Sequence, residues 1–118
     1  MAADAQVARA LALALPETEE ASHFGKADFR VGGKVFGSLP REGRMNLRLD
    51  PAEQRALVAV SPEAFEPAPG AWGRQGWTGI ELALVAEDEL RELIVSAWLR
   101  RAPRRLAAAY EAAHPPAP

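Results

Sequence analysis

The chain has 118 residues, a net charge of −2 and no cysteine. This length suffices for one hydrophobic core, so we expect a single domain over residues 1–118. The lack of cysteine excludes disulfides, thiolate nucleophiles and cysteine-ligated metals, and is typical of a cytoplasmic protein. No apolar run approaches the ~20 residues of a membrane span, and Asp4 interrupts the basic start that a signal peptide needs. We therefore expect a cytoplasmic protein without a membrane partner.

The first predicted element is a helix over Ala5–Leu15. Val7, Leu11 and Ala14 are spaced to lie on one apolar face of it. Pro16 ends this helix, because a proline disfavours the helical conformation of the residue before it. The polar connector 17–20 and a short strand over 22–24 follow.

Three consecutive antiparallel strands are predicted between residues 24 and 49. They cover Ala27–Val31, Lys34–Leu39 and Met45–Leu49. Gly32 and Gly33 form a two-residue turn, because glycine readily adopts the positive φ that a tight hairpin requires. Pairing across this turn sets Phe29 opposite Phe36. The loop Pro40–Arg44 joins the second strand to the third.

The next predicted helix begins at Pro51, is capped by Asp50 and reaches Val60. Its Leu57 and Val60 are expected to face inward. After a connector at 67–70, a strand is predicted over Trp77–Val85. Its length and apolar content indicate a central position in the sheet. Its inward residues are Ile80, Leu82 and Leu84.

Two helices complete the chain. The first, Glu87–Arg101, has apolar residues at the spacing of one helical face, namely Leu90, Leu93, Ile94, Ala97 and Trp98. The second is predicted over Pro103–Ala113, with Leu106, Ala109, Tyr110 and Ala113 inward. Residues 114–118 form a flexible proline-rich tail. The order of elements predicts an α+β fold, in which a β-meander plus a later strand form an antiparallel sheet packed with N-terminal, middle and C-terminal helices.

The charge is unevenly distributed along the chain. Residues 21–49 carry six cations and two acids, and residues 99–118 carry four arginines and one acid, whereas segments 1–20, 50–66 and 81–98 are acidic. Basic segments on an acidic background indicate an anionic partner, and DNA fits this description. The candidate nucleic-acid-binding residues are Lys26, Arg30, Lys34, Arg41, Arg44, Arg48, Arg74, Arg100, Arg101, Arg104 and Arg105. The alternative for each is a solvated sheet face or helix end.

Other residue types form no recognisable chemical site. The two histidines, His23 and His114, are far apart in the sequence, so we expect no metal. The serines at 38, 61 and 96 have no evident base, and the acids at 87–92 suit a helix start, so we expect no catalytic residues, no cofactor and no enzyme activity. Trp72 and Trp77 flank a Gly-Arg-Gln-Gly segment and are either core anchors or the walls of a binding groove.

Several short motifs occur together in this chain. They are FGK at 24–26, FRVGGKVF at 29–36, GWT at 76–78, SAW at 96–98 and APRRL at 102–106. In combination, over roughly residues 11–113, the chain resembles the MmcQ/YjbR-like proteins. The family resemblance implies an α+β fold like the double-wing DNA-binding domain of a phage transcription factor, and hence DNA binding. By position it carries the hairpin glycine and lysine onto Gly33 and Lys34, and the aromatic anchors onto Phe29, Phe36 and Trp77. Arg48 stands where relatives are expected to have lysine.

Two functions follow as hypotheses. In the first, the protein is a small DNA-binding protein or accessory regulator that uses a basic sheet face. In the second, it is a module that binds a protein partner or a small molecule in a groove lined by Trp72 and Trp77.

Overall fold

The computed structural model describes residues 2–115, apart from the side chain of His23, so residues 116–118 of the predicted tail lie outside the described part. The helices are α1 (Ala5–Leu13), α2 (Pro51–Val60), α3 (Gly70–Arg74), α4 (Glu87–Arg101) and α5 (Arg104–Ala113), with a 3₁₀ turn η1 (Leu82–Leu84). The strands are β1 (Glu19–His23), β2 (Lys26–Val31), β3 (Lys34–Arg41), β4 (Arg44–Arg48), β5 (Phe65–Pro67) and β6 (Trp77–Glu81).

All six strands form one antiparallel sheet in the order β1-β2-β3-β4-β6-β5. Helices precede, interrupt and follow the strands, so the predicted α+β class is confirmed. The strand β6 lies between β4 and β5, which confirms its predicted central position. None of the described helices is long and apolar enough to cross a membrane.

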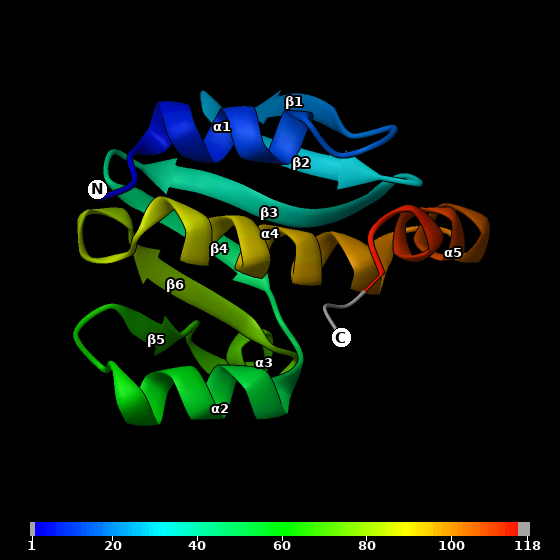
Figure 1. Ribbon diagram of the computed structural model, residues 1–118. Coiled ribbons are helices and arrows are strands. Elements are labelled where there is room, and N and C mark those ends of the chain that lie inside the picture. The colour runs from blue at the N-terminus through cyan, green and yellow to red at the C-terminus, as the bar shows by residue number, and fades with distance from the viewer. Residues whose placement is uncertain (1, 116–118) are drawn as a thin grey trace.

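Helices α1, α4 and α2 lie side by side over one face of the sheet (Figure 1). Met45 and Leu47 of β4 are fully buried on that face, and Asn46 between them points to the opposite face. The helix α4 has the predicted bounds, and all five of its predicted inward residues are buried. The inward residues of the strands, which alternate, and those of α4, which follow the helical period, therefore pack in one core between the sheet and its helices.

The first hairpin turn forms as predicted, with φ of 59° at Gly32 and 78° at Gly33. The predicted pairing of Phe29 with Phe36 is wrong by one residue, because a register shift beside Phe29 places it opposite Gly37. Such a bulge sets two residues of one strand against one of its partner. Both phenylalanines remain fully buried, with ring centroids 6.5 Å apart. A side chain at position 37 would come within 2.9 Å of the Leu47 side chain, so glycine suits that position.

The strands around this hairpin differ from prediction in length. The strand β1 begins at Glu19, inside the segment predicted as a connector, and ends at His23. Phe24 and Gly25 are not in a strand, because both have positive φ and form the β1–β2 turn. Pro40 lies inside β3 beside a register shift, so the second turn is shorter than the predicted loop.

In the second half of the chain, several residues that were predicted to face inward are exposed. The strand β6 ends at Glu81 and the chain enters η1, which leaves Leu84 58% exposed rather than inward. Val60 is 81% exposed, because α2 ends there. Ala14 at the end of α1, Ala109 in the middle of α5 and Ala113 at the end of α5 were also predicted inward and are exposed. The short elements β5 and α3 were not predicted.

Candidate nucleic-acid interface

One end of the sheet collects basic residues from segments that are distant in sequence. The strand β3 begins there, β4 ends there, and α4 ends beside them before α5 begins (Figure 1). We call this the basic end and define it by Lys34, Arg48, Arg100, Arg101, Arg104 and Arg105. The hairpin turn closes it, because Gly32 lies against Pro103, whose side chain would be 3.0 Å from an added Cβ. Of the basic residues predicted in the segment 21–49, Lys34 and Arg48 thus lie near the arginines of the α4–α5 junction.

Arg101 connects two elements at the basic end. Its Nε donates to the carbonyl oxygen of Val35 at 3.0 Å, and this bond ties the end of α4 to β3. Burial lowers the pKa of Arg101, and the positive charges of Arg48 and Arg100 lower it further. Arg48 and Arg100 are therefore close enough to Arg101 for their positive charges to act on it.

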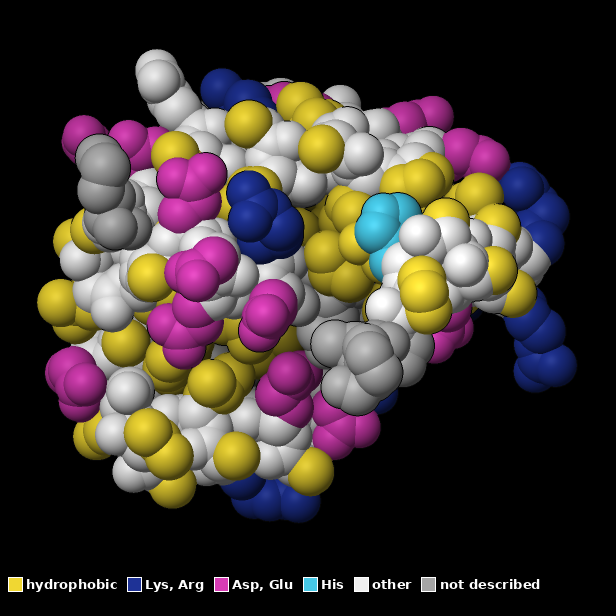
Figure 2. Space-filling view, viewed as in Figure 1, with side chains coloured by type: hydrophobic (Ala, Val, Ile, Leu, Met, Phe, Trp, Pro, Cys, Tyr) yellow, Lys and Arg dark blue, Asp and Glu magenta, His cyan; other side chains and the backbone are white. Residues whose placement is uncertain are grey.

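Two other arginines at this end are paired with carboxylates. Arg100 lies 3.1 Å from Asp50, and Arg105 makes two bonds of 3.3 Å to Glu17. Lys34, Arg48 and Arg104 have no ion pair with any residue in the described part of the chain. Figure 2 shows Lys and Arg side chains at the margin beyond α5, whereas Asp and Glu side chains gather over the first half of α4.

Arg30 lies between the buried Phe29 and Val31 and points away from the helix-covered face, but it is engaged on the sheet. Its guanidinium makes two hydrogen bonds to Asp28, at 2.9 and 3.1 Å, and these bonds raise its pKa. The predicted positive hairpin face therefore carries an internal counter-charge at this position.

Arg44 occupies the other end of β4 and is engaged more fully. It bonds to Glu81 at 2.6 Å and to Glu66, and its guanidinium occupies the space beside Gly79 where a Cβ would lie. Although burial lowers the pKa of Arg44, the bonds to these two acids raise it overall. Arg41 lies 3.5 Å from the same Glu81. These two arginines stabilise the pairing of β4, β5 and β6 rather than stand free.

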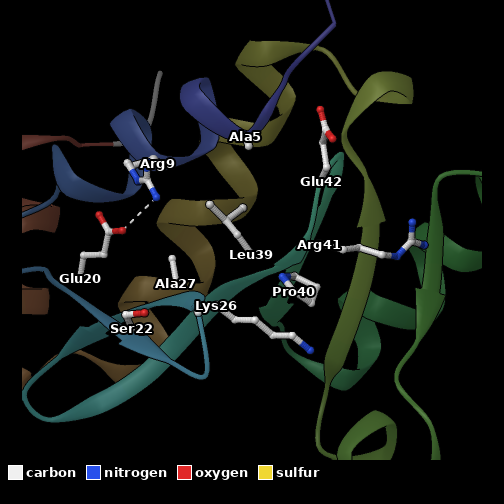
Figure 3. A pocket seen from close by; sticks show the side chains of 11 residues that line it. Ala5, Arg9, Glu20, Ser22, Lys26, Ala27, Leu39, Pro40, Arg41 and Glu42 are labelled. Carbon is white, nitrogen blue, oxygen red and sulfur yellow. Dashed lines mark ion pairs between the residues drawn. The ribbon is translucent and has the colours of Figure 1, made fainter.

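Lys26 and Arg41 line a groove of about 410 Å³ between α1 and the first three strands. Figure 3 shows both side chains extending away from Arg9, which pairs with Glu20 at 3.0 Å. Glu42 also lines this groove. The strand register places the side of the sheet with Lys26, Arg41 and Arg44 at the opposite end of the strands from the basic end.

The two tryptophans differ in exposure. Trp77 is half-buried in β6, opposite Arg48, and Trp72 is 64% exposed on α3. The neighbouring groove is lined by Arg74 and Arg55, and neither tryptophan lines it. Arg55 was missed by the sequence reasoning, because it is isolated in an acidic segment and approaches Arg74 only in the fold.

No set of three His, Asp or Glu residues in the described part of the chain is placed to hold a metal ion. His114 instead stacks on Tyr110, with ring centroids 4.1 Å apart. Tyr110 in turn contacts Trp98 at 5.3 Å, so this aromatic series fastens α5 to α4.

The YjbR family model matches residues 13–100, most of the chain. The chain belongs to the YjbR family. Within this YjbR chain, α5 and most of α1 lie outside the matched residues, so Arg101, Arg104 and Arg105 lie just beyond them.

A solved structure gives the same fold for a YjbR-like protein. The chain is similar to the crystal structure of Deinococcus radiodurans protein DR2400, which carries the domain DUF419, with a TM-score of 0.70 and 20% sequence identity. The alignment covers 89% of this chain and 83% of that one. At this identity the likeness shows the fold alone. No curated protein matches the sequence.

Proposed function

We propose that this YjbR-family chain binds nucleic acid through phosphate contacts at its basic end. The observation that carries the proposal is the position of Arg101, which is bonded to Val35 beside the hairpin turn and lies near Arg48 and Arg100. Clustered cations from separate elements are the usual footprint for a phosphate backbone. The proposal moves the contact from the sheet face to its end, because Asp28, Glu66 and Glu81 already pair with the face arginines.

The residues divide into two roles under this proposal. Lys34, Arg48 and Arg104 are the phosphate-contacting groups, since no carboxylate in the described part of the chain pairs with them. Arg101 is a positioning residue, because its Nε is committed to Val35. Phosphate contacts carry no base information, so the expected binding is independent of sequence.

We expect Arg48→Ala and Arg104→Ala each to reduce the salt dependence of duplex binding. Each lost phosphate contact should lower the slope of log K against log salt by about 1. Fluorescence anisotropy of a mixed-sequence duplex over a salt series measures this slope. Arg91→Ala is the matched control, because Arg91 pairs weakly with Glu87 on the acidic part of α4. Duplex binding that ignores salt, or an equal effect of Arg91→Ala, would contradict the proposal.

The exposure of Trp72 favours a second candidate function. A tryptophan 64% exposed on the short helix α3 is available to anchor a protein partner or a small ligand. Binding of such a partner should be lost in Trp72→Ala and unchanged in Arg30→Ala and Arg48→Ala. A binding loss in Arg48→Ala, with Trp72→Ala unchanged, would return the interaction to the basic end.

A further inference from the structure

A groove between α2 and α3 has the composition of an anion site. It has a volume of about 340 Å³, and its only charged lining residues among those described are Arg55 and Arg74. Neither arginine has an ion pair within the described part of the chain. Two exposed cations over one hollow, with no carboxylate lining it, favour an anionic occupant.

The floor of this groove is held rigidly. Gln54 is 95% buried, and its Nε2 donates to the carbonyls of Gly73 and Trp77, at 3.0 Å each. These bonds fix α2 against α3 and β6. The backbone of Gly73 packs so closely on Ala68 that an added Cβ would be 2.0 Å from its carbonyl oxygen. The groove is therefore present before any ligand binds, which reduces the entropic cost of binding.

The remaining lining is apolar and small. Pro51 and Pro67 are among the lining residues, and the groove lies where α2 begins, next to the N-cap residue Asp50. Arginine presents a planar set of donors that fits the oxygens of a phosphate. A phosphate in the groove would lie between residues that include Arg55 and Arg74, and Pro51 and Pro67 would offer apolar contact to the body attached to it.

We propose that this groove binds the phosphate group of a small phosphate monoester, with Arg55 and Arg74 as its ligands and Gln54 as a positioning residue. The inference is independent of the proposed function, because the groove shares no residue with the basic end. The phosphate could also come from a nucleic-acid backbone, and the experiment separates these two sources.

The test is an NMR titration of the full chain, first with inorganic phosphate and then with adenosine monophosphate. Saturable shifts are expected in the amides of Ala68 and Gly70 and in the side-chain Nε–Hε signals of Arg55 and Arg74. Arg55→Gln and Arg74→Gln should each weaken binding about tenfold, the loss typical of one charged hydrogen bond. Arg91→Gln, far from the groove on α4, should leave it unchanged. Both lining arginines are exposed, so their substitution should leave the remaining amide spectrum intact.

Gln54→Leu provides a second measure of the groove. It should weaken phosphate binding while the Arg55 and Arg74 signals still shift, because it removes the floor bonds and no ligand. Absence of saturable shifts with both probes would overturn the proposal. Phosphate binding by Arg55→Gln and Arg74→Gln as strong as that of the unsubstituted chain would also overturn it. Groove shifts with a duplex but not with the monoester would also overturn it, and would assign the phosphate to nucleic acid. Arg48→Ala and Arg104→Ala should leave the monoester titration unchanged. Monoester binding in the groove and duplex binding at the basic end are thus tested independently.

Discussion

Trp98→Ala should lower the free energy of unfolding by about 3–5 kcal/mol, the usual range for removal of a buried tryptophan. Trp98 is fully buried in α4, where it contacts Tyr110 of α5, and its Nε1 donates to the carbonyl of Pro16 at 3.2 Å. One side chain thus joins the end of α1, the helix α4 and the helix α5. Its removal leaves a cavity, and it also removes the donor of a carbonyl at the α1–β1 connection.

The measurement is urea denaturation followed by far-UV circular dichroism, which does not depend on the substituted fluorophore. Trp98→Phe should cost less than Trp98→Ala, because it retains most of the packing and loses chiefly the hydrogen bond, worth about 1–3 kcal/mol when its acceptor is left buried. Trp72→Ala is the matched control, since an exposed tryptophan should change stability by no more than about 0.5 kcal/mol. Equal costs for Trp98→Ala and Trp72→Ala would show that the interior position of Trp98 is wrong.

The parts of the fold that the sequence predicts well are those whose pattern is long and local. In α4, residues from Leu90 to Trp98 repeat the helical spacing over more than two turns, and the helix has the predicted bounds. The hairpin turn at Gly32 and Gly33 was equally clear, because few other residues accept positive φ. In both cases the chemistry of consecutive residues decides the conformation without help from distant segments.

The errors occur where distant contacts decide the conformation. The strand β5 has only three residues, including Pro67, and exists because it pairs with β6. The helix α3 has five residues, including Gly70 and Gly73, which are poor helix formers in isolation. In β6 the alternation continues to Leu84, but the chain turns after Glu81, and no local signal marks this change.

The candidate site shows the same division. The sequence identified the basic segments, and the fold brings the hairpin turn and the α4–α5 junction together at Gly32 and Pro103. The sequence did not reveal the partners of Arg44, because Glu66 and Glu81 lie far along the chain. These two acids reach Arg44 only through the pairing of β4, β5 and β6. A count of charges in a segment therefore overestimates the charge that a folded surface presents to a ligand.

Gly76→Ala is expected to have the second large effect, a loss of roughly 3 kcal/mol or more of stability, from backbone strain together with overpacking. Gly76 has a φ of 106°, and an added Cβ would lie 1.9 Å from the carbonyl oxygen of Leu49. No rotation of a side chain relieves a clash between a Cβ and a backbone oxygen. The Gly76 carbonyl also accepts bonds from the Leu49 amide and the Thr78 hydroxyl, both at 2.9 Å, so any displacement separates β6 from the end of β4.

Gly33→Ala separates the two causes of this loss. Gly33 also has a positive φ, of 78°, but an added Cβ there would have no heavy atom within 4 Å. It should therefore cost only the conformational strain, about 1–2 kcal/mol. Urea denaturation of both variants should show a clearly larger loss for Gly76→Ala, and amide signals at Leu49 and Thr78 should move in that variant alone. Equal losses would mean that the β4–β6 contact has room for a methyl group. The end of β4, which carries Arg48, would then be fixed less tightly against β6 than the close approach of Gly76 to Leu49 indicates.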